Sequence, residues 1–110
     1  TFGHAIESLS DYSVYTHGEA VSIGMVMAAS MAERMGMLSQ ADKKDITNLL
    51  ESVNLPTKKP DLNSNDFLES MKRDKKAQDG EIRLILLESI GKAIISNDYP
   101  NEILMKTISE

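Results

Sequence analysis

Apolar residues recur along the first half of the chain at the three- and four-residue spacing of an α-helix. Residues 3–9, GHAIESL, predict the end of a helix that begins upstream, and the turn-forming run SDYS follows them. A longer helix is predicted to begin with Thr16 as its N-cap, because Glu19 three residues later completes a capping box. This helix should continue to about Met35 and end before Gly36, which suits the left-handed residue that often follows a helix.

The helix that follows Thr16 has scarcely any polar face. Apolar and small side chains occupy most of its positions: Val21, Ile23, Gly24, Met25, Val26, Met27, Ala28, Ala29, Met31 and Ala32. A helix that is hydrophobic nearly all round is buried among other elements, and small side chains let neighbouring helices approach closely. We therefore expect this helix in the middle of a helical bundle.

The next segments predict two surface helices joined by a loop. The first is amphipathic and begins at Ser39, with apolar positions at Ile46, Leu49, Leu50 and Val53. Residues 54–65 hold two prolines and several turn formers, and so they predict a loop. A further helix is expected over residues 66–75, with Phe67, Leu68 and Met71 directed inward.

The pattern changes after residue 80. Residues 81–96, EIRLILLESIGKAIIS, are rich in Ile and Leu and predict two short strands around a turn at 89–91, although a helix is the alternative for 82–96. Pro100 at a helix N1 position predicts a last helix over 100–109. Together the elements predict a mainly α fold, a helical bundle with a short β-hairpin near the C-terminus, in one domain over residues 1–110.

Composition narrows the classes of partner. The chain is 41% hydrophobic and 26% charged, which is typical of a soluble globular domain. A net charge of −5 with only short basic clusters argues against nucleic acid, and the longest apolar stretch, residues 20–32, is too short to cross a membrane. The absence of cysteine fits a cytoplasmic protein and leaves only His, Asp or Glu to hold a metal. The abrupt opening TFGHAIE, without methionine, suggests part of a larger protein.

The sequence has two histidines, His4 and His17, as candidate chemical groups. His17 stands at N1 of the capped helix, where the positive end of the helix dipole disfavours imidazolium; a neutral imidazole can bind a metal or accept a proton. The alternative is that His17 is only tolerated in the first turn. Glu19 is better explained by its capping role than as a ligand. No H-x-x-x-H or H-E-x-x-H pattern is present, so this chain cannot complete a metal site of three ligands alone.

Four basic residues crowd the end of the helix predicted over 66–75: Lys72, Arg73, Lys75 and Lys76. Cations at this position stabilise the negative end of the helix dipole, which is the simpler explanation. The alternative is a clamp for a phosphate or carboxylate beside a pocket.

Three blocks in this order and spacing resemble the C-terminal domain of 3-dehydroquinate synthase. They are TFGHAIE, HGEAVSIGMVMAA, with thirteen positions from His4 to His17, and MKRDKKAQDGEIRLILLESIGKA. The resemblance implies a lyase of the shikimate pathway of aromatic amino acid biosynthesis. This enzyme converts 3-deoxy-D-arabino-heptulosonate 7-phosphate, a phosphorylated keto acid, to 3-dehydroquinate and phosphate, with NAD and zinc or cobalt as cofactors. It also implies a homodimer. Residues 1–110 would be the later part of the C-terminal metal- and substrate-binding domain, with the N-terminal NAD-binding domain absent.

Three site roles are implied by the same resemblance. His17 would be a metal ligand and His4 a catalytic, substrate-contacting residue, while Lys75 or Lys76 would bind the anionic substrate. The family pattern N-x-G-H-T-x-G-H-A is present here only from its threonine, so the other metal-binding histidine and a glutamate ligand are missing. We therefore expect the isolated chain to be inactive and to bind neither NAD nor the metal tightly.

Three alternatives remain at this stage. Another NAD- and metal-dependent sugar-phosphate cyclase would share the fold and cofactors. A metal-dependent alcohol dehydrogenase is more distant and would not explain the D-K-K block. The chain alone could also be a non-catalytic helical domain.

Overall fold

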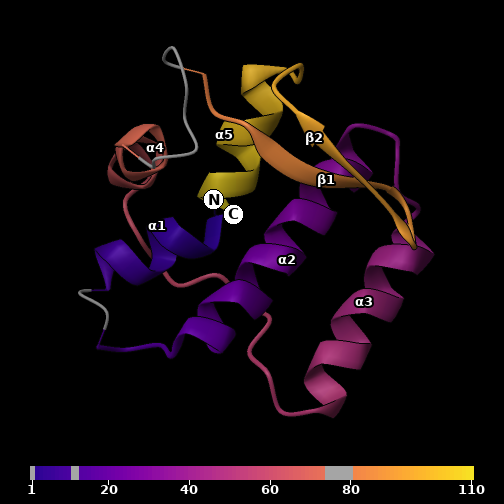
Figure 1. Cartoon of the computed structure of the whole chain (residues 1–110), viewed down its shortest axis with the longest axis horizontal. Coiled ribbons are helices and arrows are strands. Elements are labelled where there is room, and N and C mark those ends of the chain that lie inside the picture. Colours follow the sequence, from indigo (N-terminus) through magenta and orange to yellow (C-terminus); the bar gives the residue numbers. More distant parts are fainter. Residues whose placement is uncertain (1, 11–12, 74–80) are drawn as a thin grey trace.

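Helix α2 (His17–Arg34) runs through the middle of the molecule and contacts α1, α3, α5 and β1 (Figure 1). The computed structural model describes residues 2–10, 13–73 and 81–110. Around α2 lie the other elements: α1 (Phe2–Leu9), α3 (Gln40–Ser52), α4 (Ser64–Arg73), β1 (Leu84–Ser89), β2 (Lys92–Ser96) and α5 (Asn101–Ser109). This arrangement confirms the mainly α fold with a hairpin near the C-terminus and the central position of the apolar helix. No helix in the described part of the chain is long and apolar enough to cross a membrane.

The ends of α2 are where the sequence predicted them. The backbone N–H of Glu19 donates to Thr16 Oγ1 at 3.2 Å, and the backbone N–H of Thr16 donates to Glu19 Oε1 at 2.8 Å. At the other end Met35 is the C-cap, and Gly36 follows with a φ of 77°. Both ends are therefore fixed by local chemistry between residues close together in the sequence.

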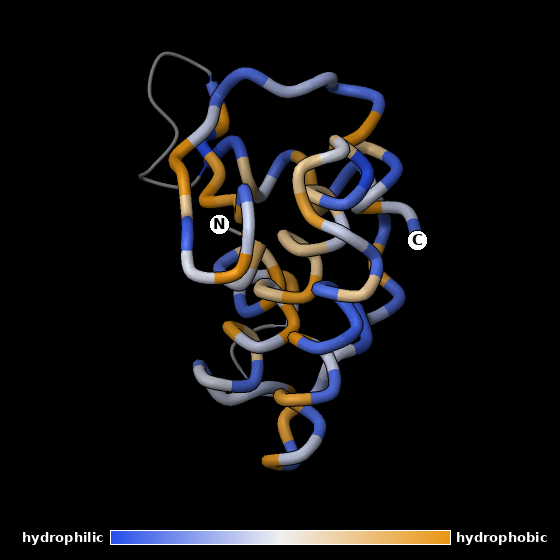
Figure 2. Tube along the Cα trace, turned by 90° about the vertical axis from the view of Figure 1, so that its right-hand side faces the viewer, coloured by the Kyte–Doolittle hydropathy of each residue, from blue (hydrophilic) through white to orange (hydrophobic). Residues whose placement is uncertain are grey.

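The main core lies where α1, α2, α4, α5 and β1 converge. Its fully buried side chains come from all five elements: Ile6, Ile23, Met31, Phe67, Met71, Leu84, Leu86, Leu104 and Ile108. Phe2 packs against Phe67 with tilted rings, 6.4 Å between their centroids. Figure 2 shows hydrophobic segments alternating with hydrophilic ones along the chain. Each such side chain contributes about 1.5–3 kcal/mol by leaving water, so this convergence stabilises the fold.

The hairpin confirms the strand prediction over the helical alternative. Strands β1 and β2 are antiparallel, with Leu84 opposite Ser96 and Ile85 opposite Ile95, and the turn contains Gly91 at a φ of 89°. Leu84 and Leu86 face α2 and the core, whereas Ile85 is 59% exposed. The alternation of strand side chains thus turns one face of β1 toward the bundle and leaves the other open.

Helix α3 is less buried than its apolar spacing predicted. Leu50 is 9% exposed, but Leu49 and Val53 are 67% and 60% exposed. The reason is that α3 packs chiefly on α2, so only a narrow stripe of its surface is covered.

Two helices begin away from their predicted positions. Helix α4 begins at Ser64 instead of residue 66, because the Asn63 side chain accepts hydrogen bonds from the backbone N–H groups of Asn65 and Asp66. Its predicted end at residue 75 lies outside the described residues. Pro100 is the N-cap of α5, with an extended ψ of 129°, and not its first helical residue.

Candidate active site

The site is positioned by a close crossing of α1 and α2. A Cβ atom placed on Gly24 would lie 2.9 Å from the backbone nitrogen of Gly3, and one placed on Gly3 would lie 3.2 Å from the carbonyl oxygen of Ala20. The two backbones therefore touch where a larger residue would hold them apart. Gly24 thus allows the close helix packing that the small residues of this helix predicted. Gly18 has open space around it.

An open cavity of about 360 Å³ lies beside this crossing, between α1, α2 and β1. It contains both histidines among its lining residues: Phe2, Gly3, His4, His17, Val21, Gly24, Met25, Ala28, Leu84 and Ile85. The fold thus brings together the two residues that the sequence singled out, although they come from different helices. We call this cavity the histidine pocket.

Glu7 of α1 holds one nitrogen of the His17 ring. His17 Nδ1 and Glu7 Oε1 are 2.8 Å apart, and the Glu7 side chain is 14% exposed while that of His17 is 70% exposed. A carboxylate accepts hydrogen bonds and has no proton to donate. When the His17 ring is neutral, this contact therefore requires the proton on Nδ1 and leaves Nε2 with its lone pair. In histidines that ligate a metal, a carboxylate commonly orients the second ring nitrogen in this way.

Glu7 is the residue that sequence reasoning did not assign. The signal was present, because Glu7 is the last residue of the G-H-A-x-E block and lies one helical turn after His4. Its partner His17 is ten residues away, across the turn between α1 and α2. Only the folded arrangement shows that the two side chains meet.

Two other described candidates, Glu19 and Lys72, have partners of their own. Glu19 is occupied by the capping box, as the sequence favoured. Lys75 and Lys76 lie outside the described residues, and Lys72, near the end of α4, is 3.7 Å from Glu69 in an exposed ion pair. Within the described ranges, no group of three or more His, Cys, Asp or Glu side chains could hold a metal ion. A metal ion bound at His17 would therefore need further ligands from outside the described residues.

The rim of the histidine pocket is apolar and exposed. Val21 and Met25 of α2 are 39% and 45% exposed, and Ile85 of β1 is 59% exposed. Val21 and Met25 thus form an exposed apolar strip on a helix that buries its opposite side in the core. The histidine pocket thus combines two histidines, His4 and His17, with an exposed apolar rim.

Solved structures of sugar-phosphate cyclases share this fold. A 2-epi-5-epi-valiolone synthase from Streptomyces hygroscopicus subsp. jinggangensis 5008, solved with NAD⁺ and Zn²⁺, matches with a TM-score of 0.80 over 97% of this chain and 31% of its own, at 24% sequence identity. A 2-deoxy-scyllo-inosose synthase complexed with carbaglucose-6-phosphate, NAD⁺ and Co²⁺ gives a TM-score of 0.71 over 98% of this chain and 33% of its own, at 23% identity. The class of fold is therefore that of the cyclases.

The sequence narrows this class to one family. The profile of the 3-dehydroquinate synthase C-terminal family matches residues 1–77, and the chain belongs to that family. The 3-dehydroquinate synthases of Pseudomonas aeruginosa (strain LESB58) and Hydrogenovibrio crunogenus are 47% and 46% identical to it over 98% and 100% of its length. The chain spans 30% and 31% of the length of these relatives.

Proposed function

We propose that these residues form the later part of the C-terminal metal- and substrate-binding domain of a 3-dehydroquinate synthase. The whole protein would convert 3-deoxy-D-arabino-heptulosonate 7-phosphate to 3-dehydroquinate and phosphate. The observation that carries this proposal is that His4 and His17 line one pocket and that Glu7 contacts the His17 ring. The identity of 47% to a synthase, against 24% to a cyclase that makes another product, favours this reaction over that of a related cyclase.

Each residue of the pocket has a distinct role in this proposal. His17 would bind Zn²⁺ or Co²⁺ through Nε2, while Glu7 holds Nδ1 and fixes the ring. When bound, the metal ion supplies Lewis acidity and NAD accepts and returns a hydride. His4 would contact the substrate and donate or accept a proton or hydrogen bond, and Lys75 or Lys76 would bind an anionic group of the substrate.

The remaining ligands would come from sequence that this chain does not include, because the synthases it resembles are about three times as long. The exposed apolar rim of Val21, Met25 and Ile85 fits a pocket that the rest of such a protein covers. The proposal therefore includes an N-terminal NAD-binding domain, a homodimer and a cytoplasmic location. It also predicts that the 110-residue chain alone turns over no substrate.

The role of Glu7 can be tested on the 110-residue chain by nitrogen-15 NMR of its two histidines. At a pH where His17 is neutral, its proton should reside on Nδ1. Glu7→Ala should move that proton toward Nε2, the form that imidazole prefers in water, and Glu7→Gln, which keeps an acceptor oxygen, should restore it. Glu33→Gln removes the same charge from the far end of α2 and should change nothing. A His17 proton on Nε2 in the unmodified chain would refute the assignment.

The metal and the reaction are tested separately in the full-length protein. His17→Ala should remove the bound metal and the activity together, and Glu7→Ala should weaken metal affinity by about 10–100-fold, the usual effect of losing an outer-shell partner. Metal content measured by mass spectrometry is the readout that does not depend on turnover. A His17→Ala protein with stoichiometric zinc contradicts the ligand assignment. Turnover of a different sugar phosphate, without turnover of the heptulosonate, contradicts the proposed reaction.

A further inference from the structure

A second pocket, of about 200 Å³, lies on another face of α2. Its α2 residues are Val26, Met27, Ser30 and Arg34, which recur at helical spacing and differ from those of the histidine pocket. Lys43, Thr57, Lys59, Thr107 and Glu110 complete its lining. The two pockets share no lining residue, so different side chains determine what each can bind.

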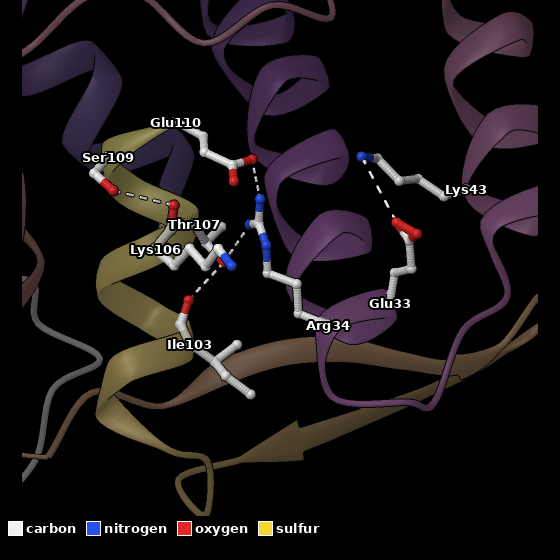
Figure 3. Close-up of polar contacts among 8 residues, drawn as sticks. All are labelled: Glu33, Arg34, Lys43, Ile103, Lys106, Thr107, Ser109 and Glu110. Atoms are coloured by element: carbon white, nitrogen blue, oxygen red, sulfur yellow. Dashed lines mark hydrogen bonds and ion pairs between the residues drawn. The ribbon is translucent and has the colours of Figure 1, made fainter.

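Cations from three separate segments line this pocket, although the chain as a whole carries a net charge of −5. Arg34 comes from α2, Lys43 from α3 and Lys59 from the segment between α3 and α4. Figure 3 shows Lys43 extending from α3 toward α2, where the Arg34 guanidinium lies beside α5. A cluster of positive charges on a chain whose net charge is negative indicates a surface suited to anions.

Arg34 is the oriented member of this set. Its side chain is 20% exposed, and Nη1 donates to Thr107 Oγ1 at 3.0 Å, while Thr107 in turn donates to the carbonyl of Ile103 at 2.8 Å. Thr107 is itself 4% exposed, so the anchor is buried. One edge of the guanidinium is thus fixed by a neutral partner, which leaves its second nitrogen for an anion.

The pocket already holds one carboxylate. Arg34 Nη2 donates to Glu110 Oε2, and the Glu110 side chain is 59% exposed. The remaining acidic neighbours are weakly placed or otherwise used: Glu33 lies 3.9 Å from Lys43 Nζ, and Glu51 accepts the hydroxyl of Thr57 at 2.8 Å. Three cations against one lining carboxylate leave charge for a dianion, and the Glu110 carboxylate is exposed enough to be displaced at small cost.

We infer that this second pocket binds the phosphate group of a small molecule, with Arg34 as its principal contact and Lys43 and Lys59 as flanking charges. A phosphate monoester carries nearly two negative charges at neutral pH, which matches the excess in the lining. The inference does not depend on the proposed function, because none of these residues belongs to the histidine pocket.

Inorganic phosphate is the probe that tests this inference, titrated at constant ionic strength into the nitrogen-15-labelled 110-residue chain. Saturable shifts are expected at the amides of Ser30, Arg34 and Thr107. Arg34→Gln and Lys59→Gln should each weaken binding, the former by about tenfold or more, because it removes the oriented charge-assisted hydrogen bonds. Lys92→Gln, which removes an exposed cation of the hairpin paired with Glu88, is the matched control and should leave the affinity unchanged.

Glu110→Gln distinguishes a binding site from a merely structural ion pair. It removes the competing carboxylate, so phosphate should bind more tightly by up to about fivefold, in keeping with the small worth of an exposed pair. Shifts that do not saturate, that persist in Arg34→Gln, or that centre on His4 and His17 would overturn the inference. Weaker binding by Glu110→Gln would overturn it as well.

Discussion

The contact between Gly24 and Gly3 can be tested by adding one methyl group. In Gly24→Ala the new Cβ would lie 2.9 Å from the backbone nitrogen of Gly3 and 3.3 Å from its Cα. Neither atom can rotate away as the tip of a side chain could. Helix α1 must therefore move away from α2, and it carries His4 and Glu7 with it.

Two opposing terms set the size of the effect. Replacing glycine by alanine inside a helix stabilises it by about 1 kcal/mol, and overpacking a close contact costs about 1–3 kcal/mol. Because the clash here involves backbone atoms, the cost should lie in the upper part of that range. The expected net loss is about 1–2 kcal/mol of unfolding free energy, whereas helix propensity alone would predict a gain. Gly18→Ala meets no atom within 4 Å and should leave stability unchanged or slightly higher.

Urea unfolding followed by circular dichroism measures both variants. The midpoint for Gly24→Ala should fall and that for Gly18→Ala should not. The nitrogen-15 spectrum provides a second readout, because a displaced α1 lengthens the Glu7–His17 contact and weakens the preference for a proton on Nδ1. If Gly24→Ala is as stable as Gly18→Ala and keeps the same His17 tautomer, the close crossing does not position the site.

Two further changes test buried hydrogen bonds. Ser22→Ala should destabilise the chain by about 1–3 kcal/mol in urea unfolding, because the buried Ser22 hydroxyl donates to the carbonyl of Pro56 at 2.7 Å, whereas the exposed Ser52→Ala should have little effect. Burial, and secondarily the charge of Glu81, raises the pKa of Tyr99, whose hydroxyl donates to the Ile82 carbonyl at 2.6 Å. The folded state therefore favours the neutral phenol, and this stabilisation is present below about pH 10 and lost as the pH rises through the raised value. Stability measured from pH 8 to 11 should fall less steeply in Tyr99→Phe, and equal slopes would contradict this reasoning.

The sequence predicted those features whose signals lie close together along the chain. Thr16 and Glu19 are three residues apart, and the hairpin turn contains a glycine with a positive φ, so both could be inferred from local chemistry. The starts of α4 and α5 also depend on local chemistry, namely the capping of α4 by Asn63 and the extended backbone of Pro100. The exposure of Leu49 could not be inferred, because helical spacing shows which residues share a face and not whether another element covers it.

The same distinction between local signals and contacts made by folding applies to the candidate site. His4 and His17 were identified by residue type and motif, and the capping box explained why His17 begins a helix. The pairing of His17 with Glu7 and the approach of Gly3 to Gly24 depend on how two helices cross, which no spacing within either helix specifies. The second pocket could not be predicted for the same reason, since its cations Arg34, Lys43 and Lys59 come from three separate segments.

Helix α2 lines both pockets. It contributes Val21, Gly24 and Met25 to one and Ser30 and Arg34 to the other, on different faces of one rigid element. The two linings share no side chain, so the direct route from a ligand in the second pocket to His17 is a shift of α2. The Gly24–Gly3 contact resists such a shift on the α1 side. Phosphate bound near Arg34 should therefore leave the His17 tautomer unchanged in the unmodified chain, and a coupled response would first become visible in Gly24→Ala, where that contact is disrupted.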